Sequence, residues 1–457
     1  MNLSEPDPGA QPAGESWLAL PSRDRRTAGL LCLSFCTLAL AYLAARTARD
    51  AVFLALLPSS ELPGMFAWSA LAVSLGLFAV TRLGSRGRPE ALFAVAAAAL
   101  GSLLFGARLG LSLGGGLVLI KALYVLVEAG SAVLALLFWQ LVEGATREPR
   151  TTGRLRELGR GAAITVLLVG SAWALLLLLA VPPRDLLLFA AGLLWVSSLP
   201  AIILSARARR DRPTSKGRPW AGILIAIGAA DLRLAAAGTT VAAFVSVLVD
   251  YQFKDIIAAS YPGDAVGIAR ATAMVFGVAA LAALGIGQAA PLLRHRLGAM
   301  ATVTGSLAVA LLGQGLLLIA PLVWVAAIAR APLETLRPSA LDATLDLVLS
   351  PVPRRLREHW TALVEVLLRP AALALGAFAL MLLAVAPRDV ILAVIAGLTL
   401  LHLIVLGLRR EHAKSLGLAR RHWPQPADVL RRLLGDATGA ASVTRAHRKP
   451  NALDAHV

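Results

Sequence analysis

Long apolar stretches dominate the pattern of this chain. Twelve of them reach about 20 residues, the length that crosses a bilayer as an α-helix, and short polar connections separate them. Their residues follow one another without the strict alternation of a membrane β-strand. The pattern predicts an all-α integral membrane protein with spans at 28–56, 64–81, 90–112, 117–143, 159–181, 185–206, 229–256, 266–290, 298–318, 321–346, 361–385 and 389–408.

An internal repeat divides these segments six and six. The string VPPRD at 181–185 parallels VAPRD at 385–389, and Arg49 and Asp50 lie 205 positions before Lys254 and Asp255. Such constant offsets indicate two parallel six-helix halves, as in major facilitator folds, with a solute site between the halves near the bilayer midplane. The predicted parts are an N-terminal tail at 1–27, a bundle at 28–206, a linker at 207–220, a bundle at 221–408 and a basic tail at 409–457.

Composition and charge placement agree with a membrane protein. The 457 residues are 58% hydrophobic, with a mean hydropathy of +0.73, which exceeds what a soluble domain needs. The net charge is +17, but the bases gather in every second connection, and the opposite connections hold only Arg184 and Arg388. The positive-inside rule then places both termini in the cytoplasm. We expect contact with anionic lipid headgroups on that side, and no nucleic-acid partner.

Motifs for catalysis or cofactor binding are absent from the sequence. There is no G-x-x-x-x-G-K-[ST] loop for ATP hydrolysis and no Cys/His metal spacing. Cys32 and Cys36 lie four apart on one helix face, where a disulfide has poor geometry, so they are interpreted as packing residues. We expect a monomer that is not an enzyme and has no catalytic residue, cofactor or metal.

Ionisable residues inside the apolar segments are the candidate chemistry. A charge at the bilayer centre costs about 2.5–3.5 kcal/mol on insertion scales, so these residues line a wet cavity or pair with each other. Arg and Lys bind phosphate or carboxylate oxygens, and acids can hold those bases until an anion competes for them. The candidate solute-binding residues are Arg46, Arg49, Asp50, Lys121, Glu128, Asp250, Lys254, Asp255, Arg330, Glu334 and Arg337.

The alternative for any of these charges is a fixed salt bridge between helices. We favour that structural interpretation for Glu365 with Arg369, and for Asp342 and Asp346, which lie near the predicted cytoplasmic ends of their segments. For the charges of the segments at 28–56, 117–143 and 229–256, and for the middle of 321–346, we favour a cavity lining, because the corresponding helices line the cavity in such folds.

Several motifs occur in a fixed order between residues 40 and 375. They are RTARD at 46–50, PGMFAW at 63–68, VEAGS at 127–131, LLFW at 136–139, LGRGA at 158–162, the residues Asp250, Phe253 and Lys254, and RPSALD at 337–342 with Pro351. In order and spacing this set resembles the nucleotide translocase family, the ATP/ADP exchangers of plastids and intracellular bacteria. The resemblance implies nucleotide exchange, importance of Glu128 and Asp250 for transport, and a bacterial inner-membrane location.

Two departures from the family pattern concern the solute. Family members often carry a lysine just before the tryptophan of the second segment, where this chain has Phe66 and Ala67. They also carry G-R-x-G-K in the eleventh segment, where this chain has RPAA at 369–372. Because two candidate phosphate contacts are missing, the departures argue against ATP and ADP and favour another anionic solute.

Three hypotheses of function follow. The first is exchange of a small organic anion by alternating access, with Arg46, Arg49, Lys254 and Arg337 binding the anion and Glu128, Asp250 and Glu334 modulating them. The second is a proton-coupled major facilitator transporter of another metabolite or drug, with Glu128 or Asp250 as the proton carrier. The third is a membrane scaffold or sensor whose buried charges are purely structural.

Overall fold

The computed structural model describes residues 22–84, 88–145, 169–176, 178–179, 181–207, 230–297, 299–336, 354–383 and 387–421. All regular elements in these ranges are helical. They are α1 (Ser22–Leu56), η2 (Ser59–Glu61), α2 (Leu62–Gly84), α3 (Pro89–Ser112), α4 (Leu117–Ala145), η3 (Pro183–Asp185), α6 (Leu186–Arg207), α8 (Ala230–Ser260), α9 (Ala265–Leu297), α10 (Ala299–Ile319), α11 (Val323–Leu336), α13 (Arg354–Leu363), η5 (Val364–Leu368), α14 (Arg369–Leu383) and α15 (Pro387–Arg421).

Helix is present in each of the twelve predicted segments, and the all-α prediction is confirmed. The segment predicted at 159–181 is described as helix over 169–176. The segment predicted at 321–346 is described as far as Leu336, where α11 ends, and the remainder of it lies outside the described residues. By length and composition, eight helices in the described part of the chain can cross a membrane.

Two of the differences between predicted segments and observed helices have a clear physical reason. Within the segment predicted at 361–385, the turn η5 is a π-helix directly before Pro370. Proline removes a hydrogen-bond donor and clashes with the carbonyl four residues earlier, so a wider turn accommodates it. The last helix extends beyond the predicted end at 408, to Arg421, because charged residues end an apolar span without ending a helix.

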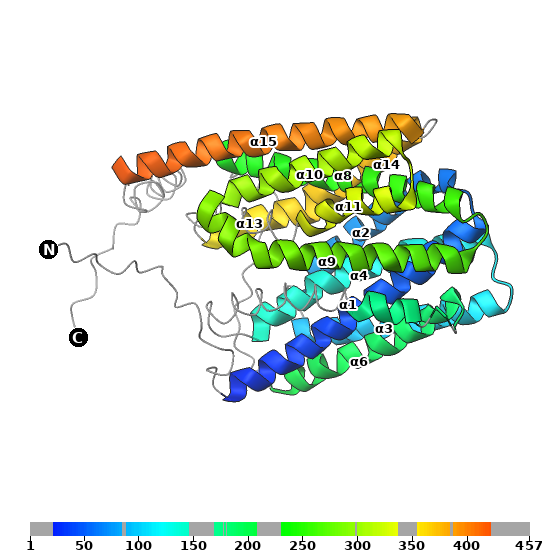
Figure 1. The fold of residues 1–457 in the computed structure, drawn as a ribbon. Helices are drawn as coiled ribbons and strands as arrows, with labels where there is room; N and C mark the ends of the chain where they lie inside the picture. The colour runs from blue at the N-terminus through cyan, green and yellow to red at the C-terminus, as the bar shows by residue number, and fades with distance from the viewer. Residues whose placement is uncertain are drawn as a thin grey trace, which may run out of the picture. The chain divides into compact units, whose positions relative to one another are not determined.

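Residues 1–406 form one compact unit, and residues 407–457 form a second, of which the end of α15 is described. Within the first unit the helices lie alongside one another (Figure 1). Helix α6 packs against α1 and α3, α2 packs against α4 and α14, and α11 packs against α8, α9 and α10. The predicted six-plus-six division and its boundaries stay predictions.

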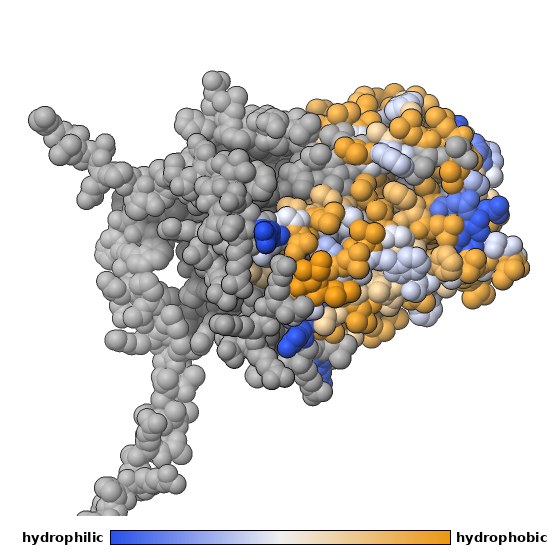
Figure 2. All heavy atoms as spheres, turned by 90° about the horizontal axis from the view of Figure 1, so that it is seen from below, coloured by the Kyte–Doolittle hydropathy of each residue, from blue (hydrophilic) through white to orange (hydrophobic). Residues whose placement is uncertain are grey.

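The outer surface of the described helices is apolar, as a bilayer requires. Figure 2 shows hydrophobic residues over most of the described surface on one face, with hydrophilic residues gathered at one end of it. Large exposed apolar side chains on α3 and α6 include Val95, Leu103, Leu199 and Ile202. In water such a surface would be an aggregation hazard, so these faces contact lipid and the chain is a multi-pass membrane protein.

Small residues allow close helix contact in this bundle, and one of them gives a test. A Cβ atom at Gly313 of α10 would lie 2.7 Å from the Cα of Ala329 in α11, so we expect Gly313→Ala to force the helices apart. Overpacking of this kind costs about 1–3 kcal/mol of unfolding free energy. Gly315→Ala is the matched control, since a Cβ there meets nothing within 4 Å. Thermal unfolding in detergent should show a lower melting temperature for Gly313→Ala only. Equal melting temperatures for the two variants would contradict the close contact of α10 and α11 at Gly313.

Candidate functional site

Seven ionisable side chains meet inside the first unit, and we refer to them as the charged cluster. They come from α1, α4, α8 and α11, and therefore from both halves of the sequence. The four bases are Arg46, Arg49, Lys254 and Arg330, and the three acids are Asp50, Glu128 and Asp250. All seven were predicted from the sequence as solute-binding residues, and the structure brings them into one connected network.

Asp250 of α8 is the most heavily shared acid of the charged cluster. Its Oδ1 accepts from Nη2 of Arg46 and from Nη2 of Arg330, each at 2.8 Å. Its Oδ2 accepts from Nζ of Lys254 at 2.7 Å, one helical turn along α8. A single carboxylate therefore holds three bases, which reach it from α1, α8 and α11.

Arg49 of α1 organises the other part of the charged cluster. Its Nε donates to Oδ1 of Asp50 at 2.9 Å, and its Nη1 donates to Oε2 of Glu128 in α4 at 2.6 Å. Lys254 Nζ lies 3.3 Å from Oδ1 of Asp50 and so connects this group to Asp250. Because Arg49, Lys254 and Asp250 each have more than one partner, replacing any of these three changes the contacts of several others.

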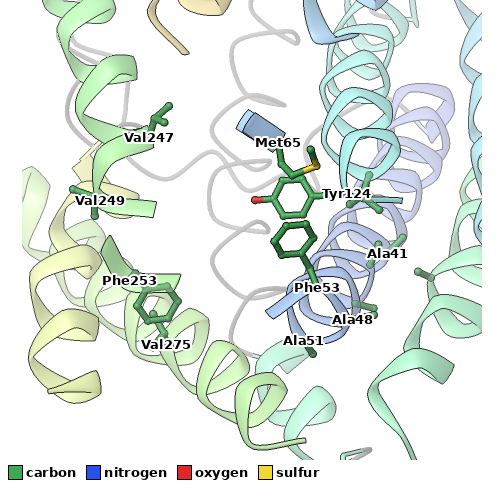
Figure 3. Close-up of a cluster of buried hydrophobic side chains, with 14 of the residues drawn as sticks. Ala41, Ala48, Ala51, Phe53, Met65, Tyr124, Val247, Val249, Phe253 and Val275 are labelled. Atoms are coloured by element: carbon green, nitrogen blue, oxygen red, sulfur yellow. The ribbon is translucent and has the colours of Figure 1, made fainter. Parts of the chain in front are cut away.

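The ring of Tyr124 in α4 lies between two of the bases. Lys254 Nζ donates to the Tyr124 hydroxyl at 2.7 Å, and the guanidinium carbon of Arg49 lies 4.1 Å from the ring centroid. Figure 3 shows this hydroxyl pointing from α4 toward α8, with the ring against Phe53. Such cation–π contacts strengthen when water is excluded, so Tyr124 positions both bases.

A second aromatic group holds the two arginines that share Asp250. Phe276 of α9 lies 5.2 Å from the guanidinium carbon of Arg46 and 5.8 Å from that of Arg330. Phe253 lies 4.7 Å from the guanidinium carbon of Arg330 on α11. We did not predict Phe253, Phe276 or Tyr124 as site residues, because an aromatic residue in an apolar segment has the same sequence pattern as a lipid-facing or core residue. Only Tyr124 could have been indicated by the sequence, through its i, i+4 spacing from Glu128.

The members of the charged cluster differ in exposure. The side chains of Arg49, Asp50, Lys254 and Arg330 are between 1% and 3% exposed, whereas Arg46 is 12%, Asp250 16% and Glu128 37% exposed. Glu128, Asp250 and Arg46 are therefore the members most accessible to a solute.

Two of the bases lie at a similar distance from a helix end. Arg49 precedes the end of α1 at Leu56 by seven residues, and Arg330 follows the start of α11 at Val323 by seven. At 1.5 Å per residue this is about 10 Å from the helix end in each case.

Two predicted site residues lie outside the charged cluster. Lys121 of α4 pairs with Glu61 at 3.0 Å, and Asp255 of α8 accepts a 2.6 Å hydrogen bond from Ser59. Both partners belong to η2, the short turn between α1 and α2. Asp255 cannot face the same way as Asp250, because five residues advance about 140° around a helix. The internal repeat gave the correct depth for Asp255 and the wrong face.

Two further predicted residues are not placed. Glu334 lies in α11, but its side chain and the whole of Arg337 lie outside the described residues. Their assignment as site residues stays a prediction, as do the pairings expected for Asp342 and Asp346. The pair expected to be structural is present, since Arg369 Nη1 lies 3.1 Å from Oε2 of Glu365.

Other features of the described part of the chain offer less chemistry. No group of three His, Cys, Asp or Glu side chains in the described residues is arranged to hold a metal ion. A cavity of about 130 Å³ lies against Leu40, Trp173 and Phe189, and its lining is apolar. An ionic solute has no partner there, so the charged cluster is the candidate site.

Comparison with solved structures establishes the fold. The nucleoside transporter NupG matches with a TM-score of 0.57 and 12% identity, over 85% of this chain and 99% of that chain. A bacterial homologue of the iron transporter ferroportin, in an inward-facing state, matches at 0.56 and 15%, over 84% and 98%. A bacterial metal transporter matches at 0.54 and 16%, over 84% and 98%. The predicted major facilitator-like fold is confirmed.

Comparison of sequences adds no family. No protein-family model matches the chain, and no curated protein matches it. At 12% to 16% identity, the structural likeness extends to the fold and not to the solute. The resemblance to nucleotide translocases therefore stays a prediction.

Replacement of Tyr124 tests the role of its ring and hydroxyl. We expect Tyr124→Phe to lower the unfolding free energy by about 1–3 kcal/mol, because Lys254 loses a buried acceptor. Tyr124→Leu should cost up to about 2 kcal/mol more, because both cation–π contacts disappear as well. Tyr261→Phe is the control, since Tyr261 is 36% exposed. Denaturation of purified protein in detergent gives the measurement, and a Tyr124→Phe protein as stable as the wild type would contradict the assignment.

Proposed function

We propose that the protein is a secondary membrane transporter that exchanges small organic anions by alternating access. The observation that carries the proposal is the charged cluster itself, a single ion-pair network that connects α1 and α4 with α8 and α11. Its four bases converge on three acids from different helices. Convergent arginine and lysine side chains are the groups that bind the oxygens of an anionic solute.

Anion binding in the charged cluster offers a physical route to alternating access. The pairs of Arg46 with Asp250 and of Lys254 with Asp50 connect the first half of the sequence to the second. An anion that takes over these bases frees their acid partners and changes the contacts between the halves. A ligand shifts a conformational equilibrium only through such a difference in binding, so exchange of partners would couple the solute to the transition.

The nature of the solute and the orientation in the membrane belong to the same proposal. The motif resemblance makes nucleotides the first solutes to test, and the missing lysines at 66–67 and 369–372 make other organic anions the next. The distribution of basic connections supports cytoplasmic termini in a bacterial inner membrane, with anionic headgroups beside these connections. Only the solute and the lipid are expected as partners of a monomer.

A second candidate function has one specific observation in its favour. Glu128 is 37% exposed although it lies within a membrane helix, and it is paired with the buried Arg49. A carboxyl group that is partly exposed and contacts a buried base is suited to carrying a proton. Proton-coupled transport of another metabolite or drug is therefore the alternative to exchange.

The exchange proposal predicts which bases matter for transport. In proteoliposomes, we expect radiolabelled nucleotides or phosphate esters to enter by counterflow against unlabelled anion. Arg330→Gln should reduce the rate at least about tenfold, because a charged hydrogen bond to the solute is worth about 1.5–3 kcal/mol. Lys121→Gln is the matched control, a base that pairs with Glu61 outside the charged cluster. If both variants are equally stable and lose the same fraction of the transport rate, the assignment of the charged cluster as the solute site is wrong. If the wild type takes up none of the anions, the proposed function is wrong.

Glu128 distinguishes the two candidate functions. Under exchange, an imposed pH gradient should leave wild-type counterflow unchanged and drive no net uptake. Under proton coupling, the gradient should drive uptake, and Glu128→Gln should abolish that uptake while counterflow continues, because the variant moves solute without its proton. Measurement of both fluxes in the same vesicle preparation separates the alternatives.

A further inference from the structure

The carboxylate of Asp250 occupies the centre of a group of cations that suits a more highly charged anion. We propose that Asp250 is a tethered competitor: its carboxylate fills the anion subsite in the solute-free protein, and a dianionic, phosphate-type group of the solute displaces it. The inference rests on the proposed function, since it assumes that the charged cluster binds an anion. Beyond the proposed function, the inference names the subsite that binds the anion, the group that must leave this subsite, and the class of anion that fits it.

The geometry around Asp250 matches three donors to one acceptor group. Arg46 and Arg330 both donate to Oδ1 at 2.8 Å, and Lys254 approaches Oδ2 at 2.7 Å. The three cations therefore converge on two oxygens and one negative charge. A phosphate monoester has three terminal oxygens, one for each donor, and up to two negative charges. The Asp250 carboxylate contacts the three bases only by sharing Oδ1 between the two arginines, and it brings a single negative charge.

The three bases have contacts besides those to the Asp250 carboxylate. Phe276 and Phe253 flank the guanidinium of Arg330, Phe276 also contacts that of Arg46, and Asp50 lies 3.3 Å from Lys254 Nζ. The bases are thus held by groups that an incoming anion need not replace. Such preorganisation reduces the cost of binding, so a departure of Asp250 would leave a formed subsite.

The partial exposure of Asp250 makes its carboxylate accessible to a competing anion. Asp250 is 16% exposed and Arg46 12%, whereas Lys254 and Arg330 are 2% and 3% exposed. The carboxylate that must leave is therefore more accessible than these two bases. Because Asp250 is covalently attached, it returns when the solute dissociates, which lowers affinity and speeds release. The apparent affinity for the solute equals the intrinsic affinity multiplied by the fraction of time for which the Asp250 carboxylate leaves the subsite free.

Neutralising Asp250 should therefore strengthen anion binding and slow transport. Phenyl phosphate, phenyl sulfate and benzoate are the probes, since they share one ring and differ in oxygens and charge. For the purified full-length protein we expect calorimetry and thermal shift to rank phenyl phosphate first. Asp250→Asn should bind phenyl phosphate about tenfold more tightly. This factor corresponds to a subsite that the Asp250 carboxylate leaves free about a tenth of the time in the wild type and that is always free in the variant. Its counterflow in proteoliposomes should fall, because release is slower.

Asp255→Asn is the matched control for charge. It removes one acid from the same helix, at a residue that contacts Ser59 and not the charged cluster. Its affinity for phenyl phosphate should equal that of the wild type. A similar gain in both variants would show only a general increase in positive potential and would overturn the inference. Weaker binding by Asp250→Asn than by the wild type would overturn it as well, even if the wild type binds and transports anions.

Loss of folding in Asp250→Asn is itself informative. Three bases without their carboxylate should destabilise the variant, and phenyl phosphate added during purification should restore the fold by taking the vacant position. A variant that stays unfolded at saturating phenyl phosphate would overturn the inference. Failure of the proposed function is distinguishable, because then the wild type neither binds nor transports any of the anions tested.

Discussion

The sharing of one carboxylate by three bases is the interaction on which the rest of this structure depends. Asp250 contacts Arg46, Lys254 and Arg330 at distances of 2.7 to 2.8 Å, and two of these bases are at most 3% exposed. Removing one partner of a buried ion pair typically costs about 3–5 kcal/mol, because the other charge stays unpaired. A fold with several such charges can be stable only if its helices keep them together.

The packing of the helices follows from that requirement. Helices α1, α4, α8 and α11 each contribute at least one member of the charged cluster, while α9 contributes Phe276, the ring that two arginines share. Hydrophobic residues cover most of the described outer surface in Figure 2. Inside, aromatic rings lie against the arginines of the charged cluster. Aromatic rings suit this position, since they are apolar enough to pack in a membrane core and still stabilise a cation.

The sequence allowed the fold and the members of the charged cluster to be predicted, but not their arrangement. Apolar length alone located the helices, and the rarity of intramembrane charge selected residues such as Arg49, Asp250 and Lys254. The internal repeat was a poor guide to Asp255. A constant offset between two halves matches positions along a helix, but it does not determine which face of the helix a residue occupies when the surrounding sequence differs. Phe276 gave no signal, because aromatic residues are common in every apolar segment, and Tyr124 gave only its spacing of four residues from Glu128. The turn η2 acquired partners from α4 and α8 that no local pattern indicates.

The uneven exposure of the charged cluster is an argument against a purely structural lock. A scaffold or sensor that used these charges only to fix its helices would gain most from balanced pairs sealed on all sides. Here the most buried of the described members are mainly bases, and Glu128 remains 37% exposed beside Arg49. Buried bases paired with more exposed acids favour a ligand that brings negative charge to those bases. The same asymmetry explains why the acids, and not the bases, are the groups that a solute would displace.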